Sequence, residues 1–100
     1  MEKRKFAFLM QDEHFNAEPD YARFECPFVE SHIFSVRTMD EAKEILRRLP
    51  DMGFGCVELC SSFDAEMCKE LYEMVDGRML IGHVEFPPEH LGRLMEFWSD

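Results

Sequence analysis

The sequence predicts a single α/β domain with a four-stranded, mainly parallel sheet and flanking helices, in the order β-(α)-β-α-β-α-β-α. Three observations predict this fold. Short apolar segments alternate with amphipathic ones, successive strands are separated by about one helix, and no hairpin turn joins the central strands. Connections of this length imply parallel strands with right-handed crossovers. One hundred residues is a common size for one domain, so residues 1–100 are expected to share one core.

Four segments have the composition of strands. Each is short and apolar, and each is followed by acidic residues, a helix-capping residue or proline. The predicted strands are residues 5–11, 31–37, 55–60 and 78–85.

Two helices are predicted between the later strands. In residues 39–49 apolar side chains recur at i, i+3, i+4 and i+7, and Thr38 with Glu41 forms a capping box at the start. Residues 63–76 contain a second apolar stripe, for which Ser61 and Ser62 are candidate N-caps.

Two segments leave alternatives open. In residues 12–30, Pro19 can begin a short helix that ends near Glu25, and the alternative is a long aromatic-rich loop. In the tail, the apolar stripe through Leu91 and Trp98 predicts a helix. That helix packs on its own sheet or docks on a second subunit.

The charge of the chain excludes several partners. It has 21 acidic and 11 basic residues, for a formal net charge of −10, and no basic stripe. Nucleic-acid binding requires such a stripe, and an anionic membrane surface repels an acidic chain, so neither partner is expected. No segment approaches the ~20 apolar residues of a membrane span. The apolar residues after the basic start are too few for a signal peptide, so a cytoplasmic location is expected.

The four cysteines are not expected to hold a metal or form disulfides. Cytosolic thiols stay reduced, and the sequence has no C-x-x-C pair. Cys56 and Cys60 lie in one predicted strand, roughly 13 Å apart, too far for two ligands of one zinc ion. Motifs for dinucleotides, P-loops, HExxH metal sites and nucleophile elbows are absent, so no cofactor is predicted.

A site in this fold is expected at the carboxyl ends of the strands, where open α/β sheets bind ligands. The ligand-binding candidates there are Asp12, Arg37, Ser61 and Ser62. Cys60 is expected to directly precede a helix, whose N-terminus attracts anions and lowers the pKa of a thiol. Cys60 is therefore predicted to be the most thiolate-like cysteine and a catalytic candidate, and the alternative is an inert residue before an ordinary helix cap.

Three further side chains are catalytic candidates. Glu58 lies within an apolar strand, and His83 and Glu85 share one face of the last strand. Together they form a cluster suited to acid–base chemistry, or they simply face water on a solvated side of the sheet.

The chain resembles a family of small prokaryotic proteins of about this length that is catalogued only as a domain of unknown function. The likeness lies in Lys5-Phe-Ala-Phe, Glu41-Ala-Lys-Glu, Phe54-Gly-Cys-Val-Glu-Leu-Cys60-Ser-Ser-Phe63 and Gly82-His-Val. In that family glycines usually follow the cysteine, whereas this chain has Ser61 and Ser62. The resemblance implies an α/β fold and brings no activity or catalytic residue.

Two functions from different classes are consistent with these features. The first is a domain that binds a small molecule or anion at the carboxyl edge of the sheet, with catalysis left open. The second is a non-catalytic module that self-associates as a homodimer, through the tail at residues 87–98 or the aromatic segment at 15–28.

Overall fold

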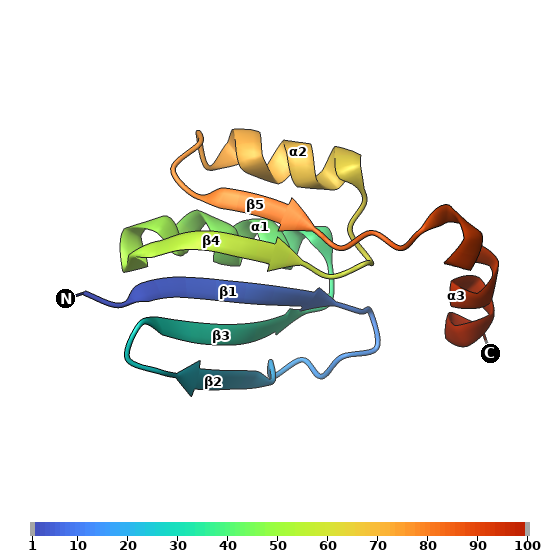
Figure 1. The fold of residues 1–100 in the computed structure, drawn as a ribbon, viewed down its shortest axis with the longest axis horizontal. Coiled ribbons are helices and arrows are strands. Elements are labelled where there is room, and N and C mark those ends of the chain that lie inside the picture. Colours follow the sequence, from blue (N-terminus) through green and yellow to red (C-terminus); the bar gives the residue numbers. More distant parts are fainter. Residues whose placement is uncertain (1, 100) are drawn as a thin grey trace.

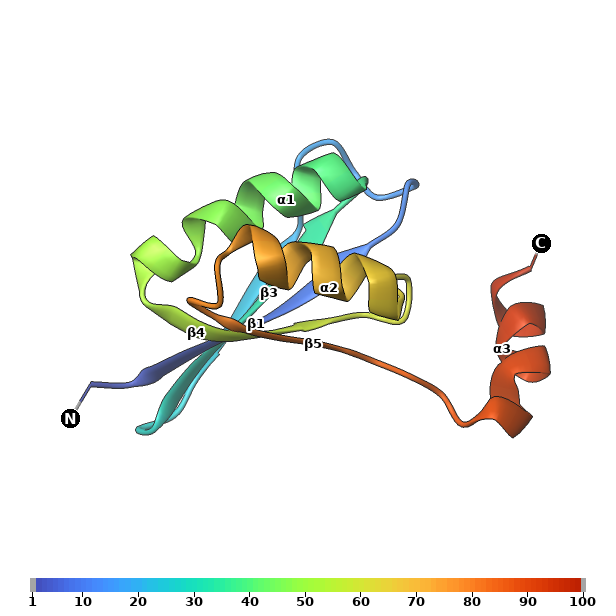
Figure 2. The same cartoon turned by 90° about the horizontal axis from the view of Figure 1, so that it is seen from above.

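A computed structural model describes residues 2–99. The described chain forms one mixed sheet of five strands, in the order β2-β3-β1-β4-β5, with two helices across one face and a third helix beyond its edge (Figures 1 and 2). The strands are β1 (Arg4–Gln11), β2 (Tyr21–Glu25), β3 (Val29–Val36), β4 (Phe54–Leu59) and β5 (Leu80–His83). The helices are α1 (Met39–Arg48), α2 (Ala65–Met74) and α3 (Leu91–Trp98). The predicted α/β class with a mainly parallel sheet is confirmed.

The sheet is parallel except at one edge. β1 lies at the centre and pairs in parallel with β3 and β4, and β4 pairs in parallel with β5. β2 is the exception, because it pairs antiparallel with β3.

The predictions of four strands and of a helix at 19–25 were wrong, because β2 occupies that segment. A tight turn at residues 26–28 joins β2 to β3, and the Cys26 N–H donates to the Val29 carbonyl at 3.0 Å. The Tyr21 ring packs against that of Phe34, with 5.3 Å between the ring centroids. Pairing with β3 satisfies the backbone groups of this short segment, which has no apolar stripe for a helix to bury.

Both covering helices begin at a side-chain cap. The Thr38 hydroxyl accepts from the Glu41 N–H at 3.2 Å, as the capping box predicts. At α2 the cap is Asp64, whose carboxylate accepts from the Met67 N–H at 2.8 Å. The predicted caps Ser61 and Ser62 are therefore wrong, since they lie in the turn before α2.

The core lies between the sheet and the helices α1 and α2. Ala7 and Leu9 of β1, Val57 and Leu59 of β4, and the buried faces of both helices form one cluster.

Both crossovers, from β3 to β4 and from β4 to β5, run in the same direction across the sheet. Right-handed crossovers in one direction put their helices on one face. The connection from β1 to β3 runs the other way, but it is made by β2 within the sheet. The second face therefore has no helix over it within residues 2–99 (Figure 2).

The tail does not follow the first of its two predicted alternatives. After β5 the chain leaves the sheet, forms a 3-10 turn at Pro88–His90 and continues as α3, which lies beyond the carboxyl edge (Figure 2). This projection makes the molecule elongated, with extents of 45 × 27 × 26 Å. The expectation that the tail helix packs on its own sheet was wrong.

Candidate functional site

The carboxyl ends of the four parallel strands place most of the predicted ligand residues along one edge of the sheet. From β1 the chain continues toward β2 and β3, and from β4 it continues toward β5. The point where these connections diverge, between β1 and β4, is where such sheets form a ligand crevice.

In this chain the turn after β4 fills that crevice. Ser62 Oγ donates to the carbonyl of Gln11 at 2.8 Å, and the Gln11 N–H donates to Cys60 Sγ at 3.4 Å. The Cys60 N–H donates to the carbonyl of Leu9 at 3.0 Å. Cys60 and Ser62 therefore connect the ends of β1 and β4 through hydrogen bonds, and both Ser61 and Ser62 are exposed.

The two charged ligand candidates are bound to neighbours of their own. The Arg37 guanidinium donates to Glu41 Oε2 at 2.8 and 3.2 Å, and these hydrogen bonds hold the pKa of the Glu41 carboxyl below its usual range. Asp12 Oδ1 accepts from the His14 N–H at 2.8 Å, and this backbone hydrogen bond lowers the pKa of Asp12. The Arg37 charge is thus paired with Glu41, and the Asp12 carboxylate stays ionised and repels anions, which leaves little at this edge to attract an anion.

His83 and Glu85 lie together at the end of β5, as predicted. His83 Nε2 is 3.3 Å from Glu85 Oε1, and the histidine side chain is mostly buried. His83 Nδ1 is buried and has no hydrogen-bond partner among residues 2–99. The two residues border a cleft of about 350 Å³ between the start of α2 and α3, together with Ser61 and Asp64.

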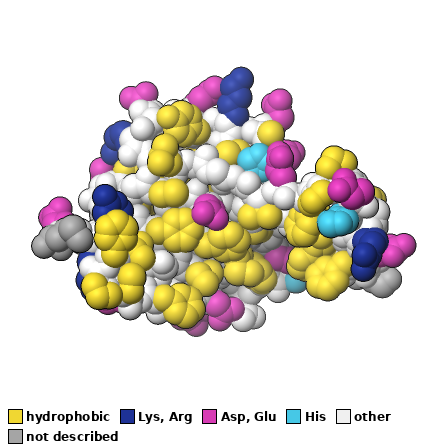
Figure 3. Space-filling view, viewed as in Figure 1, with side chains coloured by type: hydrophobic (Ala, Val, Ile, Leu, Met, Phe, Trp, Pro, Cys, Tyr) yellow, Lys and Arg dark blue, Asp and Glu magenta, His cyan; other side chains and the backbone are white. Residues whose placement is uncertain are grey.

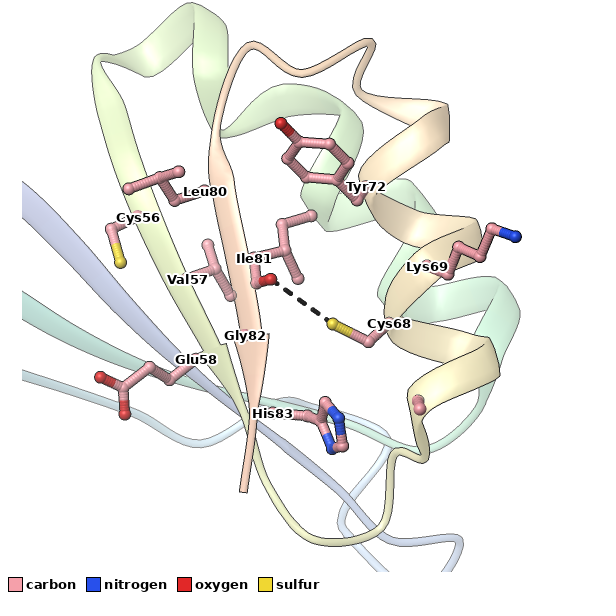
Figure 4. A pocket seen from close by; sticks show the side chains of 11 residues that line it. Cys56, Val57, Glu58, Cys68, Lys69, Tyr72, Leu80, Ile81, Gly82 and His83 are labelled. Atoms are coloured by element: carbon pink, nitrogen blue, oxygen red, sulfur yellow. Dashed lines mark hydrogen bonds between the residues drawn. The ribbon is translucent and has the colours of Figure 1, made fainter. Parts of the chain in front are cut away.

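Glu58 does not join this pair, so the predicted three-residue cluster was wrong. In the register of β4 and β5, Glu58 lies opposite Gly82 and Leu59 lies opposite His83. Successive side chains of a strand point to opposite faces, so Glu58 and His83 lie on different sides of the sheet. Figure 4 shows His83 and Glu58 on the two sides of β5.

A hollow of about 730 Å³ follows the unpaired edge of β5. Lys69 and Tyr72 of α2 border it on one side of β5, and Cys56 and Glu58 of β4 border it on the other (Figure 4). Cys68 Sγ donates to the Ile81 carbonyl at 3.4 Å. The hollow is thus the exposed rim of an edge strand, and the two catalytic candidates that line it, Glu58 and His83, lie on opposite sides of that strand.

The cysteines lie in different surroundings, and Cys60 does not occupy the position that the sequence predicted for it. The helix after β4 begins at Ala65, so Cys60 does not directly precede a helix N-terminus. Cys26 is exposed in the hairpin turn, where hydrogen bonds from the Phe28 and Val29 backbone lower its pKa. Burial raises the pKa values of Cys56 and Cys68, and the charge of Glu58 adds to the rise at Cys56.

We therefore expect Cys26 to be alkylated first. Its lowered pKa gives a larger thiolate fraction below neutral pH, and the thiolate is the attacking species. Iodoacetamide labelling of the folded protein between about pH 6 and pH 8, with mass-spectrometric assignment of sites, measures the order. Cys56 and Cys68 should label last, and equal rates for Cys26 and Cys68 would contradict this account. Faster labelling of Cys60 would support the prediction made from the sequence.

The second face of the sheet was missed as a site. We call it the open face, and it consists of the outward side chains of all five strands. Its apolar members are Phe6, Phe8, Met10, Ala22, Phe24, Ile33, Cys56 and Leu80, and its polar members near the centre are Ser31, Ser35 and Glu58. Figure 3 shows hydrophobic side chains over most of this face. The signal was present in β1, where Phe6, Phe8 and Met10 alternate with the core residues Ala7 and Leu9. Apolar residues on both sides of a strand indicate that both sides are covered.

Two other kinds of site find no support between residues 2 and 99. That part of the chain contains no group of three or more His, Cys, Asp or Glu side chains placed to hold a metal ion. None of its helices has both the length and the apolar character needed to cross a bilayer.

Residues 4–99 match a family described as a family of unknown function, DUF6506. The chain belongs to this family. No curated protein and no solved structure matches the chain. For this DUF6506 member, the functional argument therefore rests on two features of its own structure: the carboxyl edge with its bonded polar groups, and the open face.

Proposed function

We propose that this chain is a self-associating module in which two copies pack through the open face. The observation that carries the proposal is a mainly parallel sheet with helices on only one side. Parallel sheets are found almost only with both faces covered, because their strands are apolar on both sides. Large contiguous apolar patches on a protein surface mark interaction sites.

Self-association is better supported than the binding of a small molecule or anion at the carboxyl edge. Of the four predicted ligand residues there, Arg37, Asp12 and Ser62 already make intramolecular hydrogen bonds. The open face has the opposite character, because no helix among residues 2–99 covers its apolar side chains. The aromatic segment at 15–28, one of the two regions predicted to mediate dimerisation, contributes Phe24 to this face.

The proposal predicts that a charge placed on the open face weakens association. Met10 lies near the carboxyl end of the central strand and is 38% exposed, so Met10→Lys is compatible with the folded monomer. We expect this variant to weaken association at least about tenfold, because a charge within an apolar interface must be desolvated. Light scattering after gel filtration, over a range of protein concentrations, gives the mass.

Met52→Lys is the matched control. Met52 is 53% exposed, lies in the 3-10 turn between α1 and β4, and is outside the open face. The same change of side chain and charge there should leave association unchanged. The proposal is wrong if the wild-type chain is a monomer at high concentration, or if both variants associate equally. A native mass spectrum of a monomer with a bound small molecule would favour the carboxyl edge instead.

A further inference from the structure

The helix α3 carries the second unpartnered apolar surface of the molecule. Met95 and Phe97 are 74% exposed, Trp98 is 66% exposed and Leu91 is 47% exposed. At 100° per residue Leu91, Met95 and Trp98 fall on one side of the helix together with Leu94. Phe97 lies outside this stripe, next to Arg93. An eight-residue helix with this composition gains most of its stability from packing against something.

The linker explains why α3 does not cover its own sheet. Residues 84–87 run away from the end of β5, and Pro87 has the extended angles φ −54° and ψ 141°. Pro87 and Pro88 fix their own backbone and restrict the residues before them, which disfavours a tight reversal. Four extended residues span about 13 Å, so the linker holds α3 beyond the carboxyl edge, where a second molecule can reach it (Figure 2).

We propose that α3 of each copy packs on the open face of the other, so that two copies exchange their C-terminal arms. This inference rests on the proposed function and specifies its contact. The apolar side of α3 does not pack on the sheet of its own chain, and the open face of that sheet is not covered by a helix. In a twofold dimer each such contact occurs twice.

The area involved is sufficient for a stable dimer. Burying the exposed side chains of the apolar stripe of α3 removes on the order of 400 Å² from water per helix. Two exchanged helices, with the parts of the open faces that they cover, then bury roughly 1,600 Å² in total, which is the size of a standard stable interface.

Trp98 reports directly on the exchange, because it is the single tryptophan of the chain. As the protein is concentrated from the monomer to the dimer, we expect its emission to shift to shorter wavelength and its quenching by acrylamide to fall. Met95→Lys should weaken association about tenfold or more and abolish the shift. The control Met52→Lys should retain it.

A mixture of two defective variants tests the exchange further. Met10→Lys has an intact arm and a damaged face, whereas Met95→Lys has a damaged arm and an intact face. At a protein concentration at which each variant alone is monomeric, an equimolar mixture should recover part of the association. The mixed dimer has one intact contact, between the arm of the first variant and the face of the second, whereas neither homodimer has any. Two faces packing without arms give no such recovery, since Met95 would then not matter.

The outcomes separate this inference from the proposed function. If the dimer forms and Met10→Lys dissociates it, while Trp98 stays exposed at all concentrations, the exchange is wrong and the open face remains the interface. If Trp98 is shielded equally at all concentrations in a monomer, α3 closes on its own sheet and both proposals are wrong.

Discussion

Replacing Leu9 by alanine is expected to lower the free energy of unfolding by about 2–5 kcal/mol. Leu9 is fully buried on the central strand, between the sheet and the helices, and belongs to the core cluster that includes Leu46 of α1 and Leu59 of β4. The truncation loses the favourable transfer free energy of the side chain and leaves a cavity. Because β1 is hydrogen-bonded to a strand on each side, the backbone cannot move in to fill that cavity. Urea unfolding followed by far-UV circular dichroism measures the change.

Leu91→Ala is the matched control, measured at a concentration where the protein is monomeric. Leu91 is about half exposed at the start of α3, so its truncation should change the stability of the monomer by less than about 0.5 kcal/mol. Equal losses for the two variants would show that the core does not lie between the sheet and the helices α1 and α2.

Raising the salt concentration is expected to strengthen self-association by on the order of a hundredfold between about 0.01 M and 0.15 M sodium chloride. Each copy has a formal net charge of −10, so two copies repel each other when they approach. The Debye length falls from about 30 Å to about 8 Å over this range, which removes most of the repulsion but leaves the apolar contact intact. Sedimentation equilibrium at several salt concentrations gives the dissociation constants.

A charge variant outside the interface provides the control. Glu73 is exposed on α2, on the side of the sheet opposite the open face, and Glu73→Lys reduces the net negative charge. The variant should associate more tightly than the wild type at low salt and about equally at 0.15 M. Association that weakens as salt rises would mean that ion pairs hold the copies together, which contradicts an apolar interface.

The choice between helix and strand for residues 21–25 had the largest consequence for the fold. A helix there would be the crossover from β1 to β3 and would cover the second face of the sheet. The strand lies in the sheet instead and leaves that face open. The preference of a five-residue segment for helix or strand is weak, and the edge of β3 decided it by providing hydrogen-bond partners.

In the candidate site, contacts between residues close in sequence were predictable, whereas contacts that depend on how two strands pair were not. The pairing of His83 with Glu85 was predictable, because side chains two positions apart in an extended chain lie on the same side, and the contact forms although β5 itself ends at His83. The separation of Glu58 from His83 was not, because it depends on the register of β4 against β5. A shift of one residue in that register would have placed the two side chains on the same face. The cap of α2 could not be predicted either. Ser61, Ser62 and Asp64 are equally good capping residues, and the position at which β4 ends decides which of them caps the helix.

The sequence by itself determined the α/β class, the parallel central strands, the capped helix α1 and the acidity of the surface. Each of these depends on the period of the apolar residues, on a capping side chain near its helix, or on composition, all of which act over a few residues or need no structure. Only the tertiary structure decided that β2 joins the edge of the sheet, that both covering helices share one face, and that α3 extends beyond the sheet. These features depend on which distant segments supply hydrogen bonds and apolar contacts, and that information is not present in any single segment of the chain.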